Sequence, residues 1–99
     1  MKLSIKSTQL ELSEAIKADI EKKLGNLDKY YDRILDAQVE VEKTSDHHRK
    51  GDIYRAEINV SVPGDALRAE SLQDTIAKAL TDLRKKIILV VKKYKEKKG

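Results

Sequence analysis

The clearest secondary-structure signal in the chain is residues 54–65, Tyr54-Arg55-Ala56-Glu57-Ile58-Asn59-Val60-Ser61-Val62-Pro63-Gly64-Asp65. Its first nine residues alternate between core-forming and polar side chains, which is typical of a strand with one buried face. Pro63-Gly64-Asp65 predicts a turn, because proline presets φ and glycine tolerates a left-handed backbone. Leu67 and Ala69 alternate with polar residues after the turn, so a further short strand is expected.

The segments on either side of this stretch complete the pattern. Alternating apolar residues predict strands over residues 2–6 and 37–41. Apolar residues at helical spacing predict one helix over residues 13–31, with Ser13 as its N-cap, and another from residue 72 to the mid-90s. Gly25, inside the first of these, suggests a close approach to the sheet. Ser71 followed by Asp74 has the spacing of a capping box for the second helix.

The element order is therefore β-α-β-β-β-α. It predicts an α+β fold with a four-stranded mixed sheet and two helices packed on one face, a dsRBD-like arrangement. The one-sided alternation of the strands implies that the other sheet face is in water. A chain of 99 residues is expected to form one domain, residues 1–99.

The composition limits where such a protein works. The chain has no cysteine, so it forms no disulfide and is compatible with a reducing cytoplasm. The N-terminus lacks the long apolar segment of a signal peptide. The longest unbroken apolar run, residues 87–91, is too short to cross a bilayer. We therefore expect a cytoplasmic protein without a membrane partner.

Catalytic and metal-binding patterns are missing from the sequence. There is no glycine-rich phosphate loop, and no serine or threonine has a plausible histidine partner. His47 and His48 are adjacent in a polar connection, without cysteine or the spacing of a metal site. We therefore expect no enzyme activity, metal, cofactor or small-molecule substrate.

The charge is distributed unevenly along the chain. Residues 72–99 carry nine Lys/Arg and three Asp/Glu, a net charge of +6, whereas residues 1–71 carry twelve and fourteen, a net charge of −2. On a helix, Lys78, Lys85 and Lys92 repeat every seven residues and lie almost opposite the apolar stripe. Arg84 and further lysines broaden this basic surface. Such asymmetry predicts a polyanionic partner.

Two apolar residues depart from this pattern. Leu89 projects well away from the apolar stripe of the second helix, and Ile88 lies at its margin. The simpler interpretation is that Ile88 packs on the first helix and that Leu89 is an isolated exposed residue. The alternative is a small patch for self-association or for a partner.

Three segments resemble one protein family: residues 24–34 (LGNLDKYYDRI), residues 60–70 (VSVPGDALRAE) and the closing run from Leu80 to Lys95. They are similar, in this order, to segments of the bacterial hibernation-promoting factors and ribosome-associated inhibitors, formerly called sigma-54 modulation proteins. The chain departs from the family pattern at residues 71–77, which lack its aromatic residue and one acid. The connection at residues 44–52 is longer and more polar than expected for the family. Residues 87–91 are more apolar than the family's closing helix.

The resemblance implies a hibernation factor made under stress or in stationary phase, either a short form or part of a long form that carries a second, dimerising domain. Such proteins bind the small ribosomal subunit (30S) and its 16S rRNA in the mRNA and tRNA channel near the decoding centre, and they inhibit translation. It implies rRNA contacts by Lys29, Lys85, Lys92, Lys93 and Lys95. Helix geometry adds Lys22, Lys78 and Lys86 to this predicted RNA-binding set. The protein is expected to be monomeric when free.

Two other functions are compatible with these residues. One is general binding of structured or double-stranded RNA, which similar folds perform by recognising shape. The other is a protein-interaction module that uses the apolar patch of Ile88 and Leu89.

Overall fold

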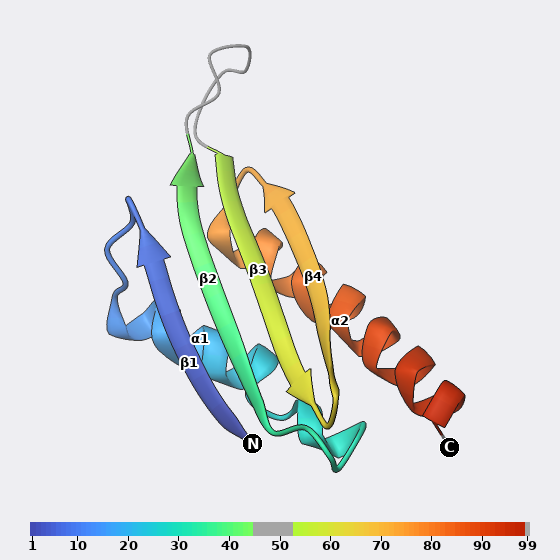
Figure 1. Ribbon diagram of the computed structural model, residues 1–99. Helices are drawn as coiled ribbons and strands as arrows, with labels where there is room; N and C mark the ends of the chain where they lie inside the picture. The colour runs from blue at the N-terminus through green and yellow to red at the C-terminus, as the bar shows by residue number, and fades with distance from the viewer. Residues whose placement is uncertain (45–52, 99) are drawn as a thin grey trace.

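The computed structural model describes residues 1–44 and 53–98. Its elements are β1 (Lys2–Thr8), α1 (Glu14–Leu24), a 3₁₀ turn η1 (Leu27–Lys29), β2 (Asp36–Thr44), β3 (Ile53–Val62), β4 (Asp65–Gln73) and α2 (Ile76–Lys98). The strand order is β1-β2-β3-β4. β1 runs parallel to β2, and the other neighbours are antiparallel. Both helices lie on one face of the sheet (Figure 1). The predicted α+β fold is confirmed.

The core lies between the sheet and the two helices. Alternate residues of the strands, such as Val39, Ile58 and Val60, point inward and are fully or almost fully buried. They meet Leu80, Leu83 and Ile87 of α2 together with the apolar side of α1. α2 packs mainly on β4 and β3 and also touches α1. This packing gives α2 a fixed inner side and leaves its outer side to solvent.

The prediction of one helix over residues 13–31 was wrong at its C-terminal end. Ser13 is the N-cap as predicted, since its Oγ accepts a hydrogen bond from the Ile16 N–H at 3.2 Å. The helix ends at Leu24, and Gly25 closes it by donating its N–H to the Glu21 carbonyl at 2.9 Å. A Cβ at Gly25 would collide with that carbonyl oxygen. The close approach at Gly25 is therefore to the last turn of α1 and not to the sheet.

The start of the second helix was also predicted wrongly. β4 continues to Gln73, because its antiparallel pairing with β3 runs from Val62↔Asp65 to Tyr54↔Gln73. Ser71 is thus an inward-facing strand residue and not a helix cap. Thr75 takes that role: its Oγ1 accepts a hydrogen bond from the Lys78 N–H at 3.1 Å.

Ser71 instead fastens α2 to β4. Its Oγ donates to Asp82 Oδ2 at 2.6 Å, and this bond, helped by Lys86, keeps the pKa of Asp82 below its ordinary value. Lys86 Nζ lies 3.1 Å from the same Asp82 oxygen and 3.0 Å from the Glu70 carbonyl. This connection holds the start of α2 against the edge strand.

Other expectations have mixed outcomes. Gly64 has a φ of 77°, as the predicted turn requires. Neither α1 nor α2, the helices of the described ranges, is apolar over a length that could cross a membrane. His47 and His48, for which no metal role was expected, lie outside the described residues.

Candidate nucleic-acid interface

The predicted RNA-binding lysines are all exposed, but they come from three elements. Lys22 lies on α1, and Lys29 lies on η1 rather than on the first helix, because that helix ends before it. The remaining six are on α2: Lys78, Lys85, Lys86, Lys92, Lys93 and Lys95. Whether they bind RNA remains a prediction, since the structure tests only their positions and their partners.

The lysines of α2 differ in how far their charge is neutralised. Lys78 Nζ lies 3.1 Å from Asp74 Oδ1, and Lys86 pairs with Asp82. Among residues 1–44 and 53–98, no carboxylate lies within ion-pair distance of Lys85, Lys92, Lys93 or Lys95, and the same holds for Lys22 and Lys29. Unneutralised charge is therefore concentrated on α2 from Lys85 to its end at Lys98 (the basic half of α2), which makes this part the strongest candidate for binding phosphates.

Arg84 does not extend the basic surface as the sequence suggested. It is half-buried, and it donates hydrogen bonds to the Lys23 carbonyl, to Asn26 Oδ1 at 3.1 Å and to the Tyr30 hydroxyl at 3.3 Å. These bonds join α2 to the end of α1 and to η1. Arg84 is therefore a positioning residue for the two helices, a role that depends on residues about 60 positions away.

Aromatic contacts fix η1 and the residues after it beside α2. The Lys92 ammonium lies 5.4 Å from the centroid of the Tyr30 ring, a cation–π contact. Tyr31 meets Tyr94 of α2 edge to face, with centroids 5.7 Å apart. Lys92 is thereby held on the side of α2 that faces η1.

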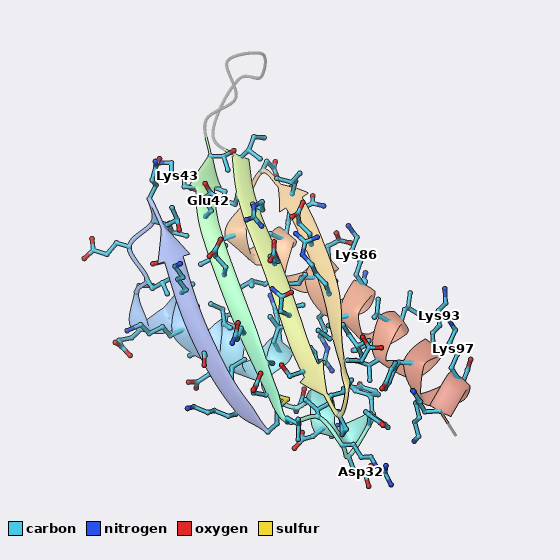
Figure 2. The ribbon with its side chains drawn as sticks, in the orientation of Figure 1. Asp32, Glu42, Lys43, Lys86, Lys93 and Lys97 are labelled. Carbon is cyan, nitrogen blue, oxygen red and sulfur yellow. The ribbon has the colours of Figure 1, made fainter. Side chains whose placement is uncertain are left out.

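Other lysines lie on the flank of α2 that faces away from η1. Figure 2 shows Lys86, Lys93 and Lys97 projecting from the side of α2 that extends beyond β4. Lys93 and Lys97 line a hollow there, together with Leu67 of β4 and Val90. The basic surface thus has two flanks, one beside η1 and one beside β4.

The open face of the sheet carries a different charge pattern. Arg55 of β3 lies at its centre, with guanidinium nitrogens 2.8 Å from Glu57, 3.2 Å from Glu70 and 3.3 Å from Glu40. A fourth carboxylate, that of Glu42, lies 3.4 Å away. Figure 2 shows this face toward the viewer, with the helices behind it.

Two more cations join Arg55 and its four glutamates, and together these residues form the ion-pair network of the sheet face. Arg68 reaches Glu57 at 2.6 Å and Glu70 at 3.2 Å, and Lys6 lies 3.8 Å from Glu40. Among the described residues, four glutamates share three cations on this face, so these carboxylates are already paired. This face offers little attraction for a phosphate backbone, so the basic helix face and the sheet face are electrostatically distinct.

The network makes stability depend on acid pH through Glu57. Hydrogen bonds donated first by Arg68, then by Asn59 and Arg55, lower the pKa of Glu57 from 4.5 to about 2. A depressed pKa contributes stability above the unfolded-state value, and this stability is lost as pH falls. We expect the wild-type melting temperature to fall between pH 4.5 and pH 2, and Glu57→Gln to flatten this dependence.

The measurement is thermal unfolding followed by circular dichroism across that pH range. Glu11→Gln, at an exposed position outside the network, is the matched control and should behave as wild type. If both variants gave the same pH profile as wild type, the network would not be the source of the acid sensitivity.

The described part of the chain offers no cluster of three or more His, Asp or Glu side chains able to hold a metal ion. What it offers is an array of exposed ammonium groups on a rigid helix. Such groups contact phosphates by charge and gain affinity through release of counterions.

Comparisons with known proteins agree with this description. The family model described as "Sigma 54 modulation protein / S30EA ribosomal protein" matches residues 3–99. The chain is 26% identical to a ribosome hibernation promotion factor of Bacillus subtilis, covering 98% of this chain and 50% of that protein. It is 36% identical to one of Deinococcus radiodurans over 62% of this chain and 31% of that protein. The chain therefore spans half or less of the length of these two relatives.

A shorter relative and two solved structures add to this. A ribosome hibernation promoting factor of Acidithiobacillus ferridurans is 33% identical over 71% of this chain and 86% of that protein. The N-terminal domain of Thermus thermophilus Protein Y superposes with a TM-score of 0.77 at 29% identity, covering 95% of this chain and 99% of that one. A ribosomal subunit interface protein of Coxiella burnetii gives 0.82 at 22% identity, with coverage of 97% and 99%, and supports the fold alone.

Proposed function

Because this chain belongs to the sigma 54 modulation protein / S30EA ribosomal protein family, we propose that it is a ribosome hibernation factor that binds the small ribosomal subunit through its 16S rRNA. The names of its relatives support the ribosome as the partner. The observation that carries rRNA binding is the set of exposed lysines on the basic half of α2, from Lys85 onward, that have no carboxylate partner among the described residues.

The mechanism is steric. α2 is held rigidly by its buried inner side, by Arg84 and by the Ser71–Asp82 bond, so its lysines are presented at fixed spacing. Such an array can follow the backbone of folded rRNA by shape, with little reading of base sequence. Occupying the mRNA and tRNA channel near the decoding centre would exclude both ligands and stop translation under stress. The proposal includes that the protein works in the cytoplasm, as a single domain that is monomeric before it binds.

The test is co-sedimentation of the protein with purified small subunits over a range of salt concentrations. Each phosphate contact contributes a slope of about −0.7 to −0.9 to log K against log[salt]. If four lysines contact phosphates, affinity should fall about 20-fold to 50-fold on raising monovalent salt threefold. Affinity that does not change with salt would contradict the proposed mechanism.

An RNA duplex of arbitrary sequence, added in the same assay, separates ribosome binding from general binding of double-stranded RNA. The proposal predicts that the duplex binds far more weakly than the small subunit. Equal affinity for the two would favour a general RNA-binding module instead.

A further inference from the structure

Leu89 lies within the basic half of α2, and it is the one large apolar side chain of this helix that the structure leaves mostly exposed. Its exposed fraction is 59%. The neighbouring positions on a helix surface are three and four residues away. For Leu89 all four of these are lysines: Lys85, Lys86, Lys92 and Lys93.

The four lysines form two rows along the helix, one of Lys85 and Lys92 and the other of Lys86 and Lys93, and Leu89 lies between them. Lys92 leans toward η1, where its ammonium covers the Tyr30 ring. Lys86 and Lys93 lie on the other side, where Lys86 pairs with Asp82 and reaches the Glu70 carbonyl, and Lys93 lines the hollow beside Leu67. The strip between the rows, about 10 Å long from Lys85 to Lys92 at the helical rise, therefore has Leu89 as its apolar centre and lysine side chains along both edges.

A ligand that fits this strip needs two anionic edges with a shallow, less polar surface between them. The minor groove of an A-form RNA duplex has this form: it is wide and shallow, and its two phosphate strands border exposed riboses and base edges. We propose that Leu89 packs on the ribose-lined floor of an rRNA minor groove while Lys85 and Lys92 on one side and Lys93 on the other contact the phosphates. This inference rests on the proposed function and names the part of the rRNA that α2 contacts.

The structure gives less support to a protein partner at Leu89. The other large exposed apolar side chains of the described residues are Met1, Leu35 and Leu72, which lie before or within strands and not on α2. A protein interface needs an apolar patch of several residues with few charges at its centre. A single leucine among four lysines lacks that area, and the lysines would repel a second copy of the same surface.

The first test compares Leu89→Ala with Leu72→Ala in co-sedimentation with small subunits. Leu72 is a matched control, because its exposed fraction of 53% is similar and it lies on the open sheet face. We expect Leu89→Ala to weaken binding about fivefold to tenfold, because less apolar area is buried, and Leu72→Ala to leave it unchanged. The salt slope should remain that of wild type, since no phosphate contact is removed.

The second test identifies what Leu89 touches. The chain contains no cysteine, so Leu89→Cys introduces a single thiol that can be labelled with a photoreactive reagent. Leu72→Cys, labelled in the same way, is its control. In the complex with small subunits, the label at position 89 should crosslink to a base-paired segment of 16S rRNA. The label at position 72 should crosslink weakly or not at all.

The outcomes separate this inference from the proposed function. Crosslinks from position 89 to a ribosomal protein, to a single-stranded loop or to a second copy of the chain would overturn the minor-groove contact, as would unchanged affinity of Leu89→Ala. If the wild-type protein bound with a steep salt slope in these cases, rRNA binding would stand. A wild-type protein that failed to bind small subunits would instead remove the proposed function.

Discussion

Replacing Lys85, Lys92 and Lys93 together by glutamate is expected to abolish binding to the small ribosomal subunit. The three side chains are exposed and have no carboxylate partner within the described residues, so their charge is available to phosphates. The change converts attraction into repulsion at three neighbouring positions. We expect affinity to fall at least about a hundredfold, with a salt slope that is shallower by about one unit for each phosphate that is no longer bound.

The fold should survive this change. None of the three side chains is part of the core. The main stabilising interaction that the change removes is the one between the Lys92 ammonium and the Tyr30 ring, worth about 0.5–1 kcal/mol. Circular dichroism and thermal unfolding check this before binding is measured. An unfolded variant would show no cooperative transition and would be replaced by the double variant Lys85→Glu, Lys93→Glu.

A control of equal charge shows whether position or total charge matters. Lys2, Lys6 and Lys17 are exposed, and they lie on β1 and on α1, away from the basic half of α2. Replacing them by glutamate also changes the net charge from +4 to −2. Co-sedimentation should be weakened only slightly. Equal loss of binding in both triple variants would mean that net charge, and not the surface of α2, controls binding.

Replacing Arg55 by methionine is expected to lower the free energy of unfolding more than replacing any other single residue of the ion-pair network on the open sheet face. Arg55 is surrounded by the carboxylates of Glu40, Glu42, Glu57 and Glu70, and its side chain is only 23% exposed. Removing it leaves the carboxylates facing one another without their shared cation. We expect a loss of about 2 kcal/mol at pH 7, less than the roughly 3–5 kcal/mol typical of fully buried pairs, because the site is partly in water.

This loss should depend on pH in a defined direction. Near pH 7 the carboxylates are ionised and repel one another in the variant. As pH falls from 4.5 toward 2, the wild-type protein loses the stability that the low pKa of Glu57 contributes, and part of that stability comes from the hydrogen bond that Arg55 donates. The difference between variant and wild type, measured by urea unfolding, should therefore shrink toward pH 3. A difference that stayed constant would contradict the electrostatic explanation.

Two observations complete this test. Arg68→Met removes a cation that is 57% exposed and contacts only two of the carboxylates, so its effect should be smaller. Folded Arg55→Met protein should bind small subunits as wild type does, because the sheet face lies opposite the helices. Weakened binding by this variant would place the rRNA contact on the sheet and not on α2.

Much of the architecture followed from local periodicity. The alternation in residues 54–62 marks Ile58 and Val60 as inward-facing, and the structure buries both. Helical spacing likewise identified the inner side of α2. The end of α1 could not be predicted in this way. Leu27 and Tyr31 also pack on the core, from η1 and the residues after it, so their spacing in the sequence is the same as that of a longer helix. At Ser71, pairing with β3 outweighed the capping pattern.

The sequence by itself determined the order of the elements, the faces they bury and the concentration of positive charge in the last helix, since each depends on residues close together in the chain. Only the tertiary structure decided which charges are free. It placed Glu70 beside Arg55 and Asp82 beside Ser71, turned Arg84 onto Asn26, and left Lys85 and Lys93 without acidic partners among the described residues. The reason is physical: the neutralisation of a charge depends on distances of a few ångströms between segments that meet only when the sheet and helices pack.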